Sequence, residues 1–453
     1  MRKLILSFAC LAVAVGCGSL STKTNEGVSE ALASHPEWAL GQTIYELNTR
    51  QLTPEGTFAA AEKELPRLKE MGVDIVWMMP IQPIGVKERK GSLGSYYAIS
   101  DYKGFNPEFG TREDFEKFLA TAHNLGLKVI LDWVANHTSP DNIWAVNDGW
   151  HKRDSLGEMK VQYDWTDISE LEFENKDMRA AMKDAMHFWA DSIGVDGFRC
   201  DMAMLVPIDF WSEAVGEIRK NKPEFFMLAE AEEPYLTEEV FNAFYGWDMH
   251  HTLNAIAQGK ITADSLYRQI AKTEKLFPER AQRMNFLSNH DENSWSGSEY
   301  ERMGEAVEGM TALTYMLPGM PLIYSGQEFG NEKRILFFDK DTIVKVEGAP
   351  QTELYTALNK LRDDNPALRY GTSELIETSE PEAGFAIVRR SGENTVVGVF
   401  NLSGGNVTLS AKKLPQGKYV DFHSGEEIRI PKEISLMPYD YKIYIRELLK
   451  TGL

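Results

Sequence analysis

The sequence predicts a (β/α)8 barrel followed by a small all-β domain. From Thr43 onward, short apolar runs alternate with amphipathic helical stretches about eight times, which is the pattern of a barrel built from βα units. One repeat carries an insertion of some forty residues, rich in Trp, Asp and turn formers, and so long a loop in a compact domain usually has a function. From Gly371 onward, β-branched segments separated by Ser-Gly turns replace this pattern, so we expect strands there.

The barrel strands are predicted from short apolar runs that end at turn formers or polar residues. In chain order these runs are residues 44–47, 73–79, 128–133, 197–201, 226–230, 244–250, 284–288 and 322–325. The helices are predicted from apolar residues that recur at helical spacing, as Phe115, Phe118 and Leu119 do before Gly126 ends the pattern. They cover residues 58–71, 112–125, 177–193, 208–220, 262–277, 300–316 and 352–365.

These elements divide the chain into a barrel at residues 37–370 and a C-terminal β-sandwich at residues 371–453. The barrel includes a short insertion domain at about residues 138–176, after the third strand. All ten tryptophans precede the C-terminal domain, the last being Trp295, so we expect any chemistry in the barrel.

The N-terminus predicts export and lipidation. A basic start and the apolar run at residues 4–15 are typical of a secretion signal, and the run is too short to span a membrane. The run ends in Ala-Val-Gly before Cys17, which resembles a bacterial lipobox; simple signal cleavage nearby is the alternative. We therefore predict a signal at residues 1–17, a lipidated Cys17 and a flexible tether at residues 18–36. The mature protein would be a membrane-anchored lipoprotein at the bacterial surface or in the periplasm.

Composition excludes several classes of protein. The chain has 43% hydrophobic and 26% charged residues, which is ordinary for globular proteins and excludes disordered, collagen-like and multi-span membrane proteins. The net charge of −20 argues against binding to nucleic acid through a basic face. The three cysteines cannot form a disulfide framework. Cys200 lies on the strand face opposite Arg199 and Asp201, so we expect a packed thiol.

Polar residues cluster where four of the predicted strands end, and in a barrel these ends meet at one mouth. The third strand gives Asp132, Asn136 and His137; the fourth, Arg199 and Asp201; the fifth, Glu230; and the seventh, His290 and Asp291. Buried ion pairs that brace the barrel are the alternative, but so many such residues at four strand ends favour a site. Convergent carboxylates suit glycoside hydrolysis, in which one acid is ionised near the anomeric carbon and another holds a proton. An arginine beside the first acid would keep its pKa low, and a drier pocket would raise the pKa of the second.

These four segments resemble the signature regions of the α-amylase family of glycoside hydrolases (glycoside hydrolase family 13). The similarity runs from about Thr43 to the C-terminus. It includes Gly94-Ser-Tyr-Tyr-Ala-Ile-Ser-Asp-Tyr102 after the second strand and Pro321-Leu-Ile-Tyr-Ser-Gly-Gln-Glu328 at the eighth. Together, in order and at barrel spacing, the segments identify the chain as a member of this family.

The resemblance implies the catalytic residues. Asp201 corresponds to the nucleophile and Glu230 to the general acid/base. Asp291 corresponds to the third carboxylate, which grips sugar hydroxyls and helps to distort the ring. Arg199 would hold Asp201 ionised and oriented. No cofactor is required for this chemistry.

The resemblance also implies residues that bind the sugar. His137 and His290 would form hydrogen bonds to the sugar at the cleaved bond, and Tyr97 would stack beneath it. Among the tryptophans in predicted loops we expect two to contact glucan, and we favour Trp165 because its insertion borders the mouth. The candidates are Trp144, Trp150, Trp165, Trp247 and Trp295.

The sequence departs from the family pattern after the expected nucleophile and in the regions that bind calcium in relatives. Met204 and Leu205 stand where many endo-acting amylases carry Lys and His, so contacts on the acceptor side are reduced. Asn136 matches an asparagine that often binds calcium, but the insertion offers no clear Asp-rich partner loop, and hard cations want six or more oxygens. A structural calcium ion is therefore an open possibility.

The sequence thus predicts a retaining hydrolase of α-1,4-glucosidic bonds in starch-like glucans and maltooligosaccharides. An α-glucosidase or 4-α-glucanotransferase with the same catalytic residues is the first alternative. A glycan-binding protein on an inactive scaffold is the second, and the intact acid trio argues against it. The expected partners are the glucan substrate and a membrane reached through the lipid anchor.

Overall fold

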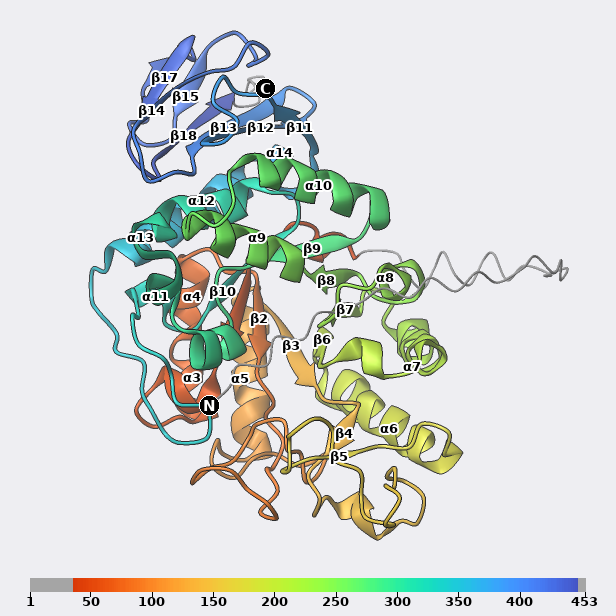
Figure 1. The fold of residues 1–453 in the computed structure, drawn as a ribbon. Coiled ribbons are helices and arrows are strands. Elements are labelled where there is room, and N and C mark those ends of the chain that lie inside the picture. Colours follow the sequence, from red (N-terminus) through yellow and green to blue (C-terminus); the bar gives the residue numbers. More distant parts are fainter. Residues whose placement is uncertain (1–35, 447–453) are drawn as a thin grey trace, which may run out of the picture.

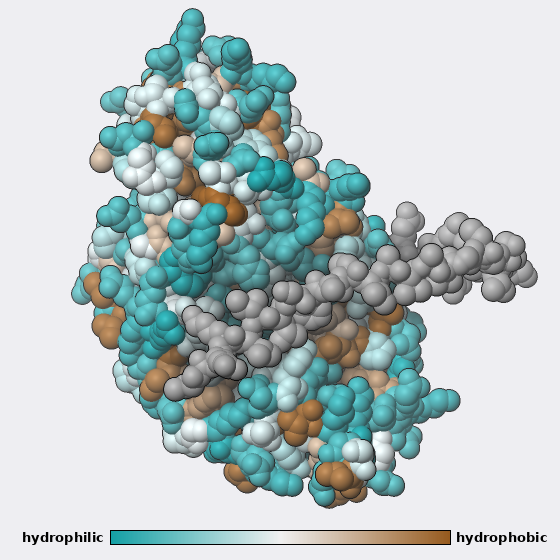
Figure 2. Space-filling view, viewed as in Figure 1, coloured by the Kyte–Doolittle hydropathy of each residue, from teal (hydrophilic) through white to brown (hydrophobic). Residues whose placement is uncertain are grey.

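The computed structural model describes residues 36–446. The predicted signal, Cys17 and all of the predicted tether except its last residue lie outside the described residues. Hydrophilic residues dominate the face shown in Figure 2, with apolar residues in scattered spots. Among the described helices, none combines the length and the apolar character that crossing a membrane requires.

Eight parallel strands form a closed barrel (Figure 1), which confirms the predicted fold class. Their spatial order is β1-β10-β9-β8-β7-β6-β3-β2. The strands are β1 (Ile44–Leu47), β2 (Ile75–Met78), β3 (Lys128–Trp133), β6 (Gly197–Cys200), β7 (Phe226–Ala229), β8 (Ala243–Tyr245), β9 (Gln282–Asn285) and β10 (Met320–Tyr324).

Helices surround the barrel and connect its strands (Figure 1). They are α2 (Thr49–Leu52), α3 (Phe58–Glu62), α4 (Leu65–Glu70), α5 (Arg112–Asn124), α6 (Lys176–His187), α7 (Ile208–Asn221), α8 (Pro234–Glu239), α9 (Trp247–Ala257), α10 (Asp264–Leu276), α11 (Glu299–Met303), α12 (Val307–Met316), α13 (Pro350–Asp364) and α14 (Pro366–Tyr370). Helix α5 begins with a capping box in which Thr111 and Asp114 bond each other's backbone N–H groups.

Three predicted elements differ from the structure. The strand predicted at residues 244–250 is wrong beyond Tyr245, because the chain turns at Gly246 and α9 then buries Met249 and Leu253 at helical spacing. The helix predicted at 58–71 divides into α3 and α4, and the second begins with Pro66 in its first turn, where proline is tolerated. The helix predicted at 300–316 divides at Gly304, whose φ of 55° a helix interior cannot accept.

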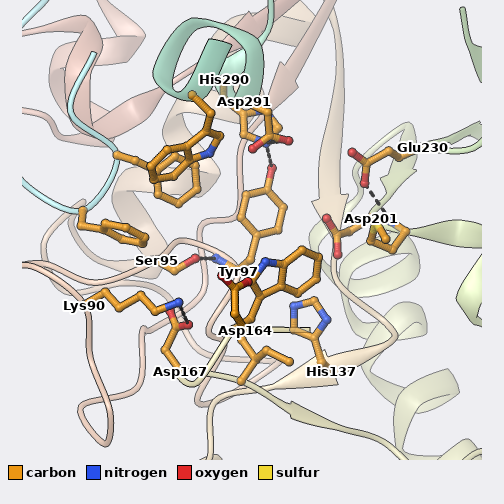
Figure 3. Close-up of a pocket in the computed structure, with 16 residues that line it drawn as sticks. Lys90, Ser95, Tyr97, His137, Asp164, Asp167, Asp201, Glu230, His290 and Asp291 are labelled. Atoms are coloured by element: carbon orange, nitrogen blue, oxygen red, sulfur yellow. Dashed lines mark hydrogen bonds and ion pairs between the residues drawn. The ribbon is translucent and has the colours of Figure 1, made fainter. Parts of the chain in front are cut away.

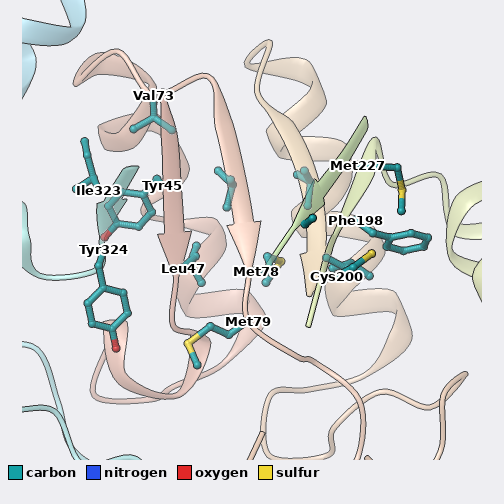
Figure 4. Packing of buried hydrophobic residues seen from close by; sticks show 14 of the residues in the cluster. Tyr45, Leu47, Val73, Met78, Met79, Phe198, Cys200, Met227, Ile323 and Tyr324 are labelled. Carbon is teal, nitrogen blue, oxygen red and sulfur yellow. The ribbon is translucent and has the colours of Figure 1, made fainter. Parts of the chain in front are cut away.

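Alternation along the strands gives the barrel two apolar layers. Residues such as Leu47, Met78 and Cys200 face outward and pack against the helices (Figure 4), so Cys200 is a buried free thiol as predicted. Inward-facing residues fill the barrel as a separate cluster made of Ala39, Ile44, Ile75, Trp77, Ile130, Phe226, Leu228, Ala243, Tyr245, Met284, Phe286, Met320 and Leu322. The interior of the barrel is therefore a packed core, and a site that substrates can reach can form only at its ends.

The insertion after β3 carries a short antiparallel pair, β4 (His137–Thr138) and β5 (Ser169–Glu170). This pair ties the far end of the insertion to the residues that directly follow β3. In Figure 1 the insertion lies beyond the end of β3, at the side of the barrel away from the C-terminal domain.

The C-terminal strands form two antiparallel sheets over their own apolar core, as the predicted fold class requires. The larger sheet has the order β11 (Thr372–Ile376), β12 (Gly384–Ser391), β13 (Asn394–Asn401), β18 (Tyr441–Arg446), β15 (Tyr419–Asp421) and β16 (Glu427–Ile428). The smaller one pairs β14 (Val407–Ser410) with β17 (Glu433–Leu436). Arg389 fastens this domain to the barrel by donating a hydrogen bond of 3.0 Å to the carbonyl oxygen of Met316 at the end of α12.

Candidate active site

The C-terminal ends of the barrel strands surround a pocket of about 510 Å³ (Figure 3). Most of the predicted site residues line it: Tyr97, His137, Trp165, Asp201, Glu230, His290 and Asp291. Arg199 lies directly behind the lining, where it contacts Asp201 and Glu230, and Asn136 is not part of the lining. The volume falls in the range of about 300–1,000 Å³ that is usual for pockets that bind small molecules.

Arg199 is the centre of the charge network beneath the pocket. Its guanidinium is fully buried and contacts three carboxylates. Nη1 lies 2.8 Å from Asp132 Oδ1 and 3.2 Å from Asp201 Oδ1, and Nη2 lies 2.9 Å from Glu230 Oε1. Nε donates to the hydroxyl of Tyr245 at 3.0 Å. One buried cation therefore fixes the positions of carboxylates from three neighbouring strands.

Asp201 lines the pocket, and only one of its two carboxylate oxygens is hydrogen-bonded within residues 36–446. Oδ1 is held by Arg199, while Oδ2 has no hydrogen-bond partner among residues 36–446. Burial and the carboxylate of Glu230 raise the pKa of Asp201 well above its ordinary value, and Arg199 opposes them. The expectation that Asp201 has a low pKa is therefore wrong. Arg199 does lower this pKa, but burial raises it by more.

Glu230 is held so that its carboxyl group faces Asp201 (Figure 3). Its Oε2 accepts a hydrogen bond of 2.8 Å from the backbone N–H of Met202. Met202 has a φ of 43°, a left-handed conformation that is unusual for a residue with a side chain, and such strain often marks a functional site. Burial raises the pKa of Glu230 above its ordinary value, in agreement with the expectation for an acid that must hold a proton.

His290 connects the third acid to a carboxylate inside the barrel. Its Nε2 lies 3.3 Å from Asp291 Oδ2, and its Nδ1 lies 2.5 Å from Oε1 of Glu46, a residue of β1. Burial alone would lower the pKa of His290, but the two carboxylates outweigh it and raise the pKa well above its ordinary value. Burial would likewise raise the pKa of Asp291, but His290 and Arg199 outweigh it and leave the pKa below its ordinary value.

Tyr97 and His137 form the polar floor of the pocket. The hydroxyl of Tyr97 donates to Asp132 Oδ2 at 2.9 Å and lies 2.8 Å from Nε2 of His290. Its ring stacks on the ring of His290 with centroids 5.2 Å apart. Burial lowers the pKa of His137 to about 4, so this imidazole is neutral at neutral pH and can donate and accept hydrogen bonds.

The five tryptophans expected in loops separate into those that line the pocket and those that do not, and one of them, Trp247, begins helix α9 instead. Trp165 and Trp295 line the pocket, and Trp295 is 55% exposed. Trp144 and Trp150 pack on each other with centroids 5.4 Å apart, against the core. Trp247 packs on the cluster inside the barrel.

Several lining residues were not predicted. Lys90, Asp167, Phe337 and Phe338 come from loops without a periodic pattern, and only the shape of the folded chain brings them to the pocket. Glu46 could have been found from the sequence, because it is an acid in the middle of the apolar run of the first strand.

Asn136, the possible calcium ligand, contacts the insertion through its side chain. Its amide Nδ2 donates to Oε1 of Gln162 at 2.7 Å, so the side chain is engaged within the insertion. Within the described residues, no three Asp, Glu, His or Cys side chains gather in a way that could hold a metal ion. Because hard cations need six or more oxygen ligands, we assign no step to a metal here.

Met204 and Leu205 lie in a short 3-10 helix (Ala203–Leu205) that follows Asp201. Met204 is half-buried and packs against the main apolar cluster, and neither residue lines the pocket. Met202 is the residue of this segment that reaches the pocket.

Known proteins share this sequence pattern and this geometry. The family profile described as "Alpha amylase, catalytic domain" matches residues 40–149 and 145–387. "Alpha-amylase MalA" of Haloarcula japonica is 30% identical over 400 residues, which is 80% of this chain and 57% of that protein. "Alpha-1,4-glucan:maltose-1-phosphate maltosyltransferase" of Salinibacter ruber is 29% identical over 415 residues, 81% of this chain and 60% of that protein. The chain thus spans less than two thirds of these two relatives.

One solved structure matches this chain over almost its whole length. The crystal structure of an alpha-amylase from Lactobacillus plantarum superposes with a TM-score of 0.81 at 30% sequence identity. The match covers 90% of this chain and 99% of that protein, so it extends beyond the barrel into the C-terminal sheets.

Proposed function

The chain belongs to the α-amylase family of glycoside hydrolases, and on that premise we propose that it hydrolyses α-1,4-glucosidic bonds in starch-like glucans and maltooligosaccharides, with retention of configuration. One observation carries the proposal. Asp201 and Glu230 share the guanidinium of Arg199 and both line the pocket, while Oδ2 of Asp201 remains without a hydrogen-bond partner among the described residues.

In the first step, Oδ2 of Asp201 attacks the anomeric carbon as the bond from that carbon to the leaving oxygen breaks. The leaving oxygen takes the proton from Glu230, and a covalent glycosyl-enzyme forms. In the second step, Glu230 removes a proton from water, the water oxygen bonds to the anomeric carbon, and Asp201 departs as a carboxylate. Two inversions give net retention.

The pKa shifts of the site leave the two proposed catalytic acids with a proton to share. Burial raises the pKa of both Asp201 and Glu230, so the coupled pair retains a proton that the reaction requires on Glu230. Positive charge that develops on the sugar ring in the transition state stabilises Asp201 as the anion. The low pKa of Asp291 leaves it ionised to accept hydrogen bonds from sugar hydroxyls.

Transfer to a second sugar in place of water is the alternative that the maltosyltransferase relative favours. Both reactions use the same glycosyl-enzyme, so the catalytic residues do not distinguish them. Product analysis on maltoheptaose separates the two: hydrolysis gives only oligomers shorter than the substrate, and transfer gives longer ones as well. We expect shorter products, and a majority of longer products would assign the protein to transfer.

We also propose that the mature protein is a lipoprotein anchored through Cys17. The basic start, the apolar run and the small residues before Cys17 support this. Expressed at full length in a Gram-negative host, the protein should fractionate with membranes and resist a salt wash, because two or more acyl chains anchor firmly. Cys17→Ala should release the protein or block its processing. Freely soluble wild-type protein after export would contradict the proposal.

A further inference from the structure

Three loops meet along one side of the pocket and form a continuous wall. It consists of residues 90–94 from the loop after β2, residues 164–167 from the insertion, and residues 337–339 from the loop after β10. Each of the three loops contributes lining residues. Direct bonds between the loops hold this wall together.

An ion pair joins the first two loops. Nζ of Lys90 lies 2.9 Å from Oδ1 of Asp167, and both residues line the pocket (Figure 3). The side chain of Asp167 is 5% exposed and that of Lys90 is 33% exposed, so the pair is shielded from solvent on the side of the insertion. A partly buried pair is screened less by salt than a fully exposed one.

Hydrogen bonds join the first and third loops. The backbone N–H of Leu93 donates to the carbonyl oxygen of Phe338 at 2.9 Å. Ser92 donates to Oδ1 of Asp339 through its backbone N–H at 2.8 Å and through its hydroxyl at 2.6 Å. The buried Arg50 donates to the carbonyl oxygens of Gly94 at 3.0 Å and Phe337 at 3.2 Å, so it holds both loops from behind.

Close backbone packing requires glycine at one point of this wall. Gly91 has a φ of 62°, and a Cβ atom there would lie 2.5 Å from Cβ of Phe338. The two loops therefore approach as closely as only glycine permits. This contact, together with the bonds among the three loops, makes the wall a fixed part of the pocket.

The wall stands on the opposite side of the pocket from the proposed acid. In Figure 3, Glu230 and Asp201 lie on one side of Tyr97, and Lys90 and Asp167 lie on the other. The leaving group must contact Glu230, so the reducing part of the chain extends on the Glu230 side. A sugar bound in this way would direct its 4-hydroxyl, which lies across the ring from the anomeric carbon, away from Glu230 and toward the side of the wall.

We propose that this wall closes the pocket toward the non-reducing end, so that the enzyme releases short products from chain ends and does not cut inside long chains. The proposal rests on the proposed function, because Glu230 as the acid fixes the direction of the sugar chain.

The test uses maltoheptaose that carries a fluorescent label at the reducing end. One sample has a free non-reducing end, and the other has its terminal 4- and 6-hydroxyls blocked by an ethylidene group. We expect the wild-type protein to cleave the blocked substrate about 100-fold more slowly, because a closed pocket rejects the added group. Equal rates for the two substrates would show that the wall does not close the pocket, and they would leave the proposed function intact. No cleavage of the free substrate would overturn both.

Variants test the ion pair itself. The double variant Lys90→Ala/Asp167→Ala removes the ion pair between two of the loops. It should raise the cleavage rate of the blocked substrate, relative to that of the free substrate, about tenfold. Lys103→Ala is the matched control, since Lys103 pairs with Asp184 away from the pocket. The control should leave the ratio unchanged. If the double variant also leaves it unchanged while its thermal midpoint shows an intact fold, the ion pair does not close the pocket.

Discussion

The two ends of the barrel interior differ sharply in chemistry, although the same strands build both. Within two residues, three strands change from an apolar side chain in the packed interior to an acid at the mouth. The pairs are Ile44 with Glu46, Ile130 with Asp132, and Leu228 with Glu230. Residues two apart on a strand share a face, so these acids sit directly above the apolar cluster. The apolar end contributes stability, and the charged end contributes the chemistry.

The charged end buries its groups at an energetic cost that the apolar end offsets. Burial raises the pKa of Glu46, Asp132, Asp201 and Glu230, which means that water would solvate each carboxylate better than the protein does. Arg199 and His290 compensate only in part. Changes at the mouth should therefore affect activity more than stability, and changes in the interior should do the reverse.

The largest effect is expected at the two proposed catalytic acids. Asp201→Asn and Glu230→Gln should each lower kcat by a factor of roughly 10⁴ or more, because each removes one partner of the double displacement. Neither should lower the thermal midpoint, since each removes a buried carboxylate whose pKa is raised. Steady-state kinetics and calorimetry check both parts. A variant that retains more than a tenth of the activity would contradict the assigned role.

Leu228→Ala tests the apolar end of the barrel, where we expect a loss of stability with little loss of activity. Leu228 is fully buried in the interior cluster, two residues before Glu230, and does not line the pocket. The cavity it leaves should lower the free energy of unfolding by about 3–5 kcal/mol. Denaturant titration measures this loss, and kcat of the folded fraction at low temperature should change little. A loss of activity larger than the loss of folded protein would show that the two ends are coupled.

Glu46→Gln tests how the charged end is tuned. The change removes a negative charge 2.5 Å from the ring of His290, so the pKa of His290 should fall and the imidazolium should be lost at lower pH. The remaining charged or titratable groups around the ring are Asp291, Tyr97, Asp132 and Arg199, and the variant leaves them in place. The alkaline limb of kcat/KM should then move to lower pH.

A matched control separates charge from packing. Glu328 is another buried carboxylate in the barrel, bonded to Tyr45 and Arg67 and absent from the pocket lining. Glu328→Gln should lower stability without moving the pH profile. Histidine NMR titration of the Glu46 variant reads the protonation of His290 directly, and an unchanged profile and titration would show that Glu46 does not tune the site.

The smallest effect is expected at Met204 and Leu205. Neither residue lines the pocket, so Met204→Lys/Leu205→His should leave kcat nearly unchanged. New donors beside the acceptor side could add one or two hydrogen bonds, which would change KM roughly two- to tenfold. KM and the cleavage position on end-labelled maltoheptaose measure this. A large change in kcat would place these residues closer to the chemistry than the structure does.

The parts of the site that depend on strand geometry are predictable from the sequence. Strand ends meet at one mouth of a barrel, so Asp201, Glu230 and Asp291 can be grouped by their positions along the chain alone. The net pKa of Asp201 cannot be predicted in this way, because it depends on how deeply the carboxyl is buried and how close Glu230 lies. Lys90 and Asp167 cannot be paired either, since only the folded loops bring them together.

Element boundaries are predictable where local chemistry decides them. Helix α5 agrees with its prediction within one residue, because a capping box begins it and Gly126 follows its end. The end of β8 is not predictable in this way, because Tyr245, Trp247 and Met249 also recur at the spacing of a strand. Only packing on the interior cluster selects the helix from Trp247 onward.

The most direct test of the central claim is to trap the glycosyl-enzyme and locate it by mass spectrometry. A 5-fluoro-α-glucosyl fluoride should form the covalent intermediate faster than water removes it, because the fluorine slows the second step. After peptic digestion, we expect one labelled peptide with the sugar on Asp201, and no label in Asp201→Asn. A sugar attached to any other residue, or hydrolysis that gives a first-formed β anomer with no labelled peptide, would contradict double displacement through Asp201.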